Sequence, residues 1–306
     1  MFGLVVAGSH GMLRTVTTSS QRTPGSIQAP DIVLYHAECT DGFGAAWAIW
    51  KKFPSATFIP AKHGFPPPPG LAGRHIVIAD FSYARPMLEA MAKEAASLLI
   101  LDHHITAQQA LEGFPHAYFD QKKSGAVLAW EWAHQSPAPW LLQYVQDKDL
   151  WEWALPDSRE VTAALSSYPF DFAQWDNFRR EALVAEGKAI LRYEQEMIGK
   201  ILAEAVTVTF HGHKVPTVQS PILTSQIGER LAKGHPFCLI WHDKDGRRYF
   251  SMRSAPDGVD VASIAIKHGG GGHTHAAGFS VPLGPGGQDP LTPLAQSAGE
   301  TSTVKS

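Results

Sequence analysis

Short apolar runs alternate with segments of helical character in the first hundred residues. The runs lie at 31–36, 76–80 and 98–104, and each is almost uninterrupted, which is typical of a strand buried on both faces. Residues 42–53 carry apolar side chains at helical spacing, and 86–96 begins with a proline, so both segments predict helices. The order strand, helix, strand, helix, strand predicts a parallel sheet with helices on both faces.

The later part of the chain predicts more helices and a second group of strands. We expect helices at 124–134 and 140–146, a long helical stretch at 177–204, strands at 206–210, 237–241 and 248–252, and a hairpin turn at 243–246. Residues 64–73 contain four consecutive prolines and predict a loop. The predicted fold class is therefore α/β, with a parallel-sheet domain joined by a helical linker to a smaller α+β domain.

Length and local composition predict two domains with an extension at each end. The expected boundaries are 1–30 for a disordered extension, 31–176 for the parallel-sheet domain, 177–204 for the helical linker, 205–283 for the α+β domain and 284–306 for a disordered tail. The first 30 residues contain no Asp or Glu and are rich in Ser and Thr, so an organelle transit peptide is the alternative to a disordered extension.

Charge and composition exclude several function classes. The net charge is −3 with histidine neutral, which gives no general attraction to long duplex nucleic acid but leaves room for a local phosphate pocket. No apolar run approaches the roughly 20 residues of a membrane-spanning helix, so we expect no membrane partner. The chain has two cysteines, Cys39 and Cys238, which form no disulfide framework and favour a reducing, cytoplasmic location.

Residues that can bind a metal follow each of the three predicted strands of the first domain. They are His36 with Asp41 just beyond it, Asp80, and Asp102, His103 and His104. One Asp after a strand is as often a helix cap or a turn residue, but the carboxyl ends of parallel strands share one crevice. Carboxylates gathered there repel one another unless they share a proton or a cation. Imidazole beside them favours Mn²⁺, or Zn²⁺ or Fe²⁺, over Ca²⁺.

The second domain has a signal of its own in the glycine-rich stretch 269–278. Small residues surround His273 there, including Gly270, Gly271 and Gly272, and such residues let the backbone approach a ligand and expose N–H groups to an anion. Arg253 lies in the strand before this stretch. The alternative is that Arg253 is an ordinary exposed arginine.

These motifs, taken in order, resemble those of the DHH phosphoesterase family. Asp102-His103-His104 resembles the signature that names the family, Asp80 resembles its second motif, and His36 with Asp41-Gly42 resembles its first. Ser124-Gly125 and the stretch Asp147–Trp151 resemble later motifs of the catalytic domain. The glycine-rich stretch and Arg253 resemble the domain that accompanies it, and the resemblance spans about 31–283.

The resemblance implies a role for each of these residues. It implies metal ligands at His36, Asp41, Asp80, His103 and Asp147, with catalytic or substrate contacts at Asp102, His104, Ser124, Gly125, Arg253, Gly270, Gly271, Gly272 and His273. Asp102 would orient a neighbouring histidine, and Asp149 is the alternative to Asp147. Many family members carry two aspartates one residue apart in the first motif; here the nearest other acid is Glu38, so either Glu38 substitutes or one ion binds weakly.

The function that the resemblance implies is hydrolysis of phosphodiester or phosphomonoester bonds by metal-activated water. The expected cofactor is Mn²⁺, as one or two ions, with Mg²⁺, Zn²⁺ or Fe²⁺ as alternatives. The expected substrate is a short nucleotide: a nano-RNA, a dinucleotide or a bisphosphorylated nucleoside. The alternatives are an exopolyphosphatase and a catalytically weak nucleotide sensor. The resemblance also allows a homodimer.

Overall fold

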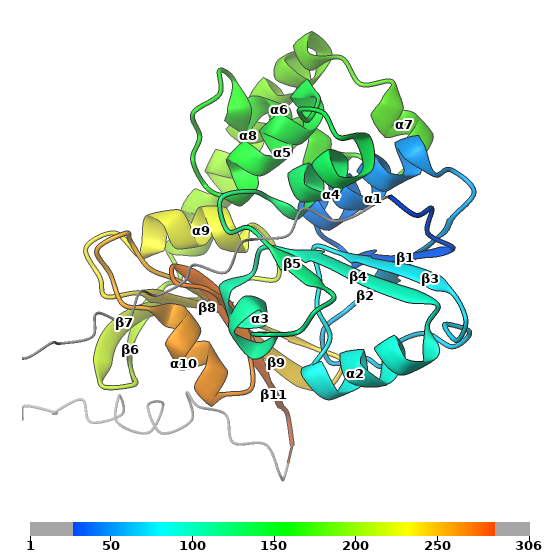
Figure 1. Cartoon of the computed structure of the whole chain (residues 1–306). Coiled ribbons are helices and arrows are strands. Elements are labelled where there is room, and N and C mark those ends of the chain that lie inside the picture. Colours follow the sequence, from blue (N-terminus) through cyan, green and yellow to red (C-terminus); the bar gives the residue numbers. More distant parts are fainter. Residues whose placement is uncertain (1–26, 285–306) are drawn as a thin grey trace, which may run out of the picture.

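The computed structural model describes residues 27–284, which form two domains joined by one long helix (Figure 1). The first domain contains β1 (Ile32–His36), α1 (Thr40–Lys52), β2 (Thr57–Ala61), β3 (His75–Ala79), α2 (Arg85–Glu94), β4 (Ser97–Asp102), α3 (Ile105–Ala110), β5 (Ala117–Phe119), α4 (Gly125–His134), α5 (Trp140–Asp149), α6 (Ser158–Ser167) and α7 (Phe172–Asp176). The joining helix is α8 (Arg180–Leu202).

The first domain is built on a five-stranded parallel sheet with the strand order β2-β1-β3-β4-β5. The chain moves outward from β1 to β2 and then returns past β1 to form β3. The order therefore reverses between β1 and β3. In open parallel sheets such a reversal opens a crevice at the carboxyl ends of the two strands, and ligands bind there.

Helices cover both faces of this sheet, so its central strands are apolar on both sides. Val33 and Val77 pack beneath α1, α4 and α5, while their neighbours Leu34 and Ile78 pack against α2 on the opposite face (Figure 1). All four residues are at most 4% exposed, which explains why these strands appear in the sequence as continuous apolar runs.

The second domain is a six-stranded mixed sheet with helices on both faces. Its elements are β6 (Val206–Phe210), β7 (His213–Gln219), α9 (Thr224–Leu231), β8 (Cys238–Lys244), β9 (Arg247–Arg253), α10 (Val261–Lys267), β10 (Gly271–His273) and β11 (Ala276–Pro282). The strand order is β10-β11-β9-β8-β7-β6, with β7 and β8 parallel and the other pairs antiparallel. Helix α10 packs on one face, and α9 with the end of α8 packs on the other.

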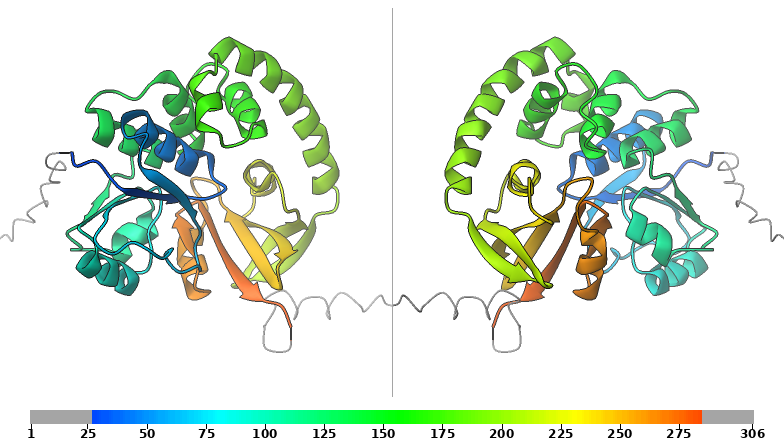
Figure 2. Two further views of the ribbon diagram at one scale, coloured as in Figure 1. Left: turned by 90° about the vertical axis from the view of Figure 1, so that its right-hand side faces the viewer. Right: turned by 90° about the vertical axis from the view of Figure 1, so that its left-hand side faces the viewer.

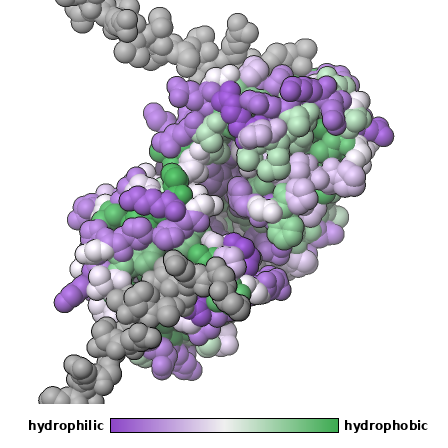
Figure 3. All heavy atoms as spheres, turned by 90° about the horizontal axis from the view of Figure 1, so that it is seen from below, coloured by the Kyte–Doolittle hydropathy of each residue, from purple (hydrophilic) through white to green (hydrophobic). Residues whose placement is uncertain are grey.

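Helix α8 arches from the first domain to the second, and a recess lies between the two domains (Figures 2 and 3). On one side of the recess α3 touches β10. On another, Arg159 of α6 forms a bidentate ion pair with Glu229 of α9, with N–O distances of 2.7 and 3.1 Å. No helix within 27–284 is long and apolar enough to cross a membrane.

The predicted fold class is confirmed, and the long apolar strands and amphipathic helices lie within a few residues of their expected positions. Several short elements were missed, among them β2, α6 and α10. The expected extension and tail lie almost entirely outside the described residues. The proline-rich stretch 64–73 is a loop, as predicted.

Candidate metal centre

Asp80 lies at the middle of the candidate site, directly after β3. Its backbone adopts the left-handed conformation with φ of 55°, which Asp tolerates better than most residues. The side chain is 1% exposed, and neither carboxylate oxygen has a hydrogen bond of good geometry among the described residues. Its nearest polar neighbours are two imidazoles, with His103 Nε2 3.1 Å from Oδ1 and His36 Nδ1 3.4 Å from Oδ2.

Two glycines allow the surrounding elements to approach this carboxylate. A Cβ at Gly42 would lie 2.2 Å from the carbonyl oxygen of His36, so only glycine lets α1 turn back directly over the end of β1. A Cβ at Gly125 would lie 2.4 Å from Asp80 Cβ, so the first turn of α4 sits against the Asp80 side chain. Three segments distant in sequence therefore meet at one point.

Asp41 joins two of these segments. Its Oδ2 accepts a hydrogen bond from the backbone N–H of Gly125 at 2.6 Å, and its Oδ1 accepts one from Ala126 at 3.0 Å. Asp41 thereby caps the N-terminus of α4, where a negative charge is stabilised. Its Oδ2 also lies 3.6 Å from His103 Nε2, so the same carboxylate faces the cluster.

The geometry favours Asp149 over Asp147 as the acid beside the cluster. Asp147 is 3% exposed, and its two oxygens accept hydrogen bonds from the backbone N–H groups of Ala154 and Leu155, at 2.8 and 3.3 Å. These two hydrogen bonds stabilise the turn that follows α5. Asp149, two residues further along, has its Oδ2 3.5 Å from His103 Nε2 and is the acid that faces the cluster.

The donor atoms form groups that share Asp80. One group is Asp41, Asp80 and His103, and a second is His36, Cys39 and Asp80; within each, the ligand atoms lie within 4.8 Å of one another. Four carboxylates in and around the cluster are Asp41, Asp80, Asp102 and Asp149. Buried oxygens without hydrogen bonds beside imidazole nitrogens are the chemistry that a divalent cation satisfies, so these residues fit a metal.

The ionisation states reflect the crowding of charge. Burial opposes ionisation of Asp80, but the contacts with His103 and His36 outweigh it and hold the pKa of Asp80 well below its usual range. Burial likewise opposes protonation of His103, but Asp80, Asp149 and Asp41 around it raise the pKa of His103 to about 10. Without a cation, the proton on His103 offsets part of the negative charge.

Asp102 orients a histidine, and that histidine is His104. Its Oδ1 lies 2.7 Å from His104 Nδ1, and its Oδ2 accepts a hydrogen bond from Ser82 Oγ at 2.6 Å. Burial opposes protonation of His104, but the charge of Asp102 and this hydrogen bond raise the pKa of His104 to about 9. His104 therefore carries a proton at neutral pH in the metal-free protein.

His273 brings the second domain to the same place. Its ring centroid lies 4.8 Å from that of His104, in a stacked arrangement, and 5.1 Å from that of His103. Burial, followed by the charges of His104 and His103, lowers the pKa of His273 to about 3. A neutral imidazole of the second domain thus faces a protonated imidazole of the first.

The glycine-rich stretch permits close packing of β10. A Cβ at Gly270 would lie 2.1 Å from the carbonyl oxygen of Gly278, and Gly272 has a φ of +136°. Gly271 faces the first domain, because its Cβ position lies 3.0 Å from Thr106 Oγ1 of α3. The glycines therefore let β10 pass between β11 and α3 and bring His273 to the site.

Arg253 lies on the face of the second sheet that carries α9. In the strand register Arg253 pairs with Ala276, and Ala276 pairs with His273, so Arg253 and His273 stand on one side of the sheet about two strand spacings, or about 10 Å, apart. The guanidinium donates to Ser225 Oγ and to the carbonyl oxygen of Met252, and it has no acidic partner among residues 27–284. A half-buried guanidinium of this kind suits an anion.

Ser124 and Gly125, at which substrate contacts are expected, lie at the start of α4. Ser124 is 0% exposed, and its hydroxyl accepts a hydrogen bond from the backbone N–H of Val127, so it caps α4. Gly125 packs against the Asp80 side chain and donates its backbone N–H to Asp41. Both residues support the cluster through α4, because neither presents a free polar group to the recess.

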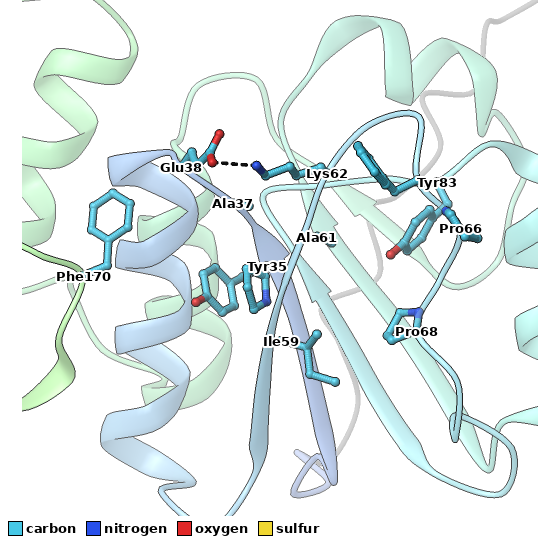
Figure 4. Close-up of a pocket in the computed structure, with 12 residues that line it drawn as sticks. Tyr35, Ala37, Glu38, Ile59, Ala61, Lys62, Pro66, Pro68, Tyr83 and Phe170 are labelled. Atoms are coloured by element: carbon cyan, nitrogen blue, oxygen red, sulfur yellow. Dashed lines mark hydrogen bonds and ion pairs between the residues drawn. The ribbon is translucent and has the colours of Figure 1, made fainter. Parts of the chain in front are cut away.

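A cavity of about 550 Å³ opens beside the carboxyl ends of β1 and β2, next to the cluster (Figure 4). Its lining includes Tyr35 and Ala37, the two neighbours of His36 in the sequence. Aromatic rings of Tyr35, Tyr83 and Phe170 project from its walls, and the ion pair between Glu38 and Lys62 lies at one end. Glu38 therefore forms its ion pair outside the cluster and does not replace an acid within it.

Sequence reasoning missed two members of the site. Cys39 stands two positions before Asp41, at the spacing where a second acid is expected, and that spacing was the available signal. Burial, followed by the charges of Asp80 and Asp149, raises the pKa of its thiol. His63 belongs to the proline-rich loop, where no pattern distinguishes it, and its ring centroid lies 5.5 Å from that of His36.

No family model matches the sequence, but two curated proteins are similar to it. The chain is 31% identical over 283 residues to an uncharacterised protein of Acanthamoeba polyphaga mimivirus, a match that covers 82% of this chain and 67% of that protein. It is 27% identical over 214 residues to oligoribonuclease NrnB of Bacillus subtilis, covering 60% of this chain and 52% of that protein. The chain thus spans about half the length of the second relative.

Among solved structures, the DHH domain of a member of the s1p family of ribosomal proteins is similar in outline, with a TM-score of 0.46, 13% identity and coverage of 82% of each chain. The similarity to the mimivirus protein is high enough, over enough of both chains, that the two share a family. The Asp-His-His motif stands at the assembled cluster, and the second relative is an oligoribonuclease. The chain belongs to the DHH family of phosphoesterases.

Proposed function

We propose that this protein hydrolyses phosphodiester or phosphomonoester bonds of short nucleotides with the help of a divalent cation. The observation that carries the proposal is the buried Asp80 carboxylate, which has no hydrogen bond and lies between His36 and His103. Burial of a charge in this way costs free energy unless a counter-ion neutralises it. Two further protein ligands are available beside it, at Asp41 and Asp149.

A bound cation would supply positive charge that polarises a phosphoryl oxygen and lowers the pKa of a water. The protein would hold it through His36, Asp41, Asp80, His103 and Asp149. Mn²⁺ is the first ion to test, because carboxylate and imidazole ligands together suit it.

Three groups around the cluster are suited to a phosphate ester. His104 is protonated at neutral pH and held by Asp102, so it can donate a proton to the oxygen of the leaving group. Arg253 offers a guanidinium without an acidic partner, which can bind a phosphate through two parallel N–H groups. Neutral His273 stacks on His104 and can hydrogen-bond to a phosphate oxygen.

A short substrate is supported by the dimensions of the site. The recess is bounded by α3 against β10 and by the Arg159–Glu229 ion pair, so a long strand would have to displace contacts between the domains. The cavity of about 550 Å³ carries aromatic rings on which a nucleobase can stack. NrnB, the relative from Bacillus subtilis, is named an oligoribonuclease.

The test is product release by the purified full-length protein with Mn²⁺. Short oligoribonucleotides, a linear dinucleotide, adenosine bisphosphate and polyphosphate are compared, with Asp80→Ala and His103→Ala as variants. We expect release from the short nucleotides and loss of release in both variants. Release from polyphosphate alone would favour an exopolyphosphatase. Binding of nucleotides without any release would favour a sensor.

A further inference from the structure

The half of the cluster beside β1 contains a sulfur atom. His36 ends β1, Cys39 precedes the first turn of α1, and Asp80 follows β3. One ligand atom from each of these three residues lies within 4.8 Å of the other two. Nitrogen, sulfur and oxygen donors therefore converge on one point at the crevice between β1 and β3.

A second observation, independent of the thiol, indicates that this point binds a ligand. Asp80 is 1% exposed, and its Oδ2, which is directed toward His36, has no hydrogen bond among the described residues. The Nδ1 atom of His36 is also buried without a hydrogen bond. The other oxygen of Asp80 faces His103, so the carboxylate can serve both halves of the cluster at once.

Neither Glu38 nor Asp41, the two acids near Cys39 in the sequence, completes the half of the cluster that contains His36. Glu38 has a φ of 58°, is exposed and forms an ion pair with Lys62 at 2.6 Å, away from the cluster. Asp41 points to the N-terminus of α4 and to His103. Within residues 27–284, Cys39 is the side chain whose donor atom groups with those of His36 and Asp80.

We propose that the thiolate of Cys39 is a ligand of the cation held by His36 and Asp80. The proposal rests on the cation binding proposed above and gives the centre two unlike halves. The half with Cys39 combines a soft sulfur ligand with imidazole and carboxylate, which favours Zn²⁺, Fe²⁺ or Co²⁺ over Mg²⁺ and Ca²⁺. The half with Asp41, Asp149 and His103 is richer in oxygen and suits Mn²⁺.

The experiment is a titration of metal-free, full-length protein with Co²⁺, followed by absorption spectroscopy. Coordination by a thiolate gives a sulfur-to-cobalt charge-transfer band in the near ultraviolet, which nitrogen and oxygen ligands do not give. We expect the band in the natural protein and in Cys238→Ser, and its loss in Cys39→Ser. Cys238 is the matched control, because it is the other cysteine of the chain and is buried in the second domain.

A second measurement needs no variant. Zn²⁺ should protect Cys39 of the natural protein from alkylation by iodoacetamide, as read from the modified peptide by mass spectrometry. Absence of the charge-transfer band from the cobalt-loaded natural protein, or its persistence in Cys39→Ser, would overturn the proposal, as would equal alkylation with and without Zn²⁺. Hydrolysis of short nucleotides without the band refutes the ligand assignment alone, whereas the band without hydrolysis supports this assignment and refutes the proposed function.

Discussion

Replacement of Gly125 by alanine tests whether the position of Asp80 is set by its contact with α4. The new Cβ would lie 2.4 Å from Asp80 Cβ, and ordinary contact begins at 3.4 Å, so the helix turn or Asp80 must move by about 1 Å. Overpacking of this kind costs about 1–3 kcal/mol of stability, and a displacement of about 1 Å at reacting groups lowers the rate by about 100-fold. We therefore expect Gly125→Ala to lose far more activity than stability.

Gly199→Ala is the matched control, because Gly199 also lies in a helix and has no atom within 4 Å of its Cβ position. Alanine there should raise the stability by up to about 1 kcal/mol and leave turnover unchanged. The assays are thermal unfolding, Mn²⁺ affinity by calorimetry, and hydrolysis of a short oligoribonucleotide. Turnover and Mn²⁺ affinity in Gly125→Ala equal to those of the natural protein would refute the claim that this contact sets the position of Asp80.

Three further predictions concern charged residues of the site. Asp149→Asn should weaken Mn²⁺ binding, which calorimetry measures. Asp147→Asn should mainly lower the free energy of unfolding, by about 2 kcal/mol, because it disturbs two hydrogen bonds from backbone N–H groups; chemical unfolding measures this loss. Asp102→Asn should lower the pKa of His104 from about 9, measured by NMR of the imidazole nitrogens in metal-free protein. Because the folded pKa is raised, the stabilisation from His104 is complete below about pH 6.5 and lost as the pH rises through about 9, and the variant should lack this dependence. Arg253→Lys should raise KM for phosphorylated substrates more than it lowers kcat, because lysine cannot form two parallel hydrogen bonds to phosphate; an unchanged KM would contradict a role in binding.

The parts of the fold that were predictable are those buried on both sides. Strands β1, β3 and β4 are continuous apolar runs because helices cover both faces of the sheet, and such runs are visible without an alignment. Strand β2 was missed because it lies at the sheet edge, is only partly buried and contains Pro60, which is tolerated only at such an edge. Strand β10 is three residues long and consists of two glycines and a histidine.

The site residues at the ends of strands were predictable from the sequence, whereas those that depend on a turn were not. His36 ends a strand, Asp80 and His103 follow buried strands, and parallel topology brings such positions together. The choice between Asp147 and Asp149 depended on which carboxylate the turn after α5 uses for its own N–H groups, and spacing alone does not contain that information. Cys39 was overlooked because a single cysteine is more often packing than ligand.

The protonated state of His103 has a consequence for how the site responds to its surroundings. Its pKa of about 10 means that at neutral pH the metal-free cluster already holds a proton where a cation would bind. A divalent ion that takes up Nε2 must displace this proton, so loading is an exchange of metal for hydrogen ions. Affinity should then rise about tenfold per pH unit for each proton released, and an acidic surrounding would empty the centre.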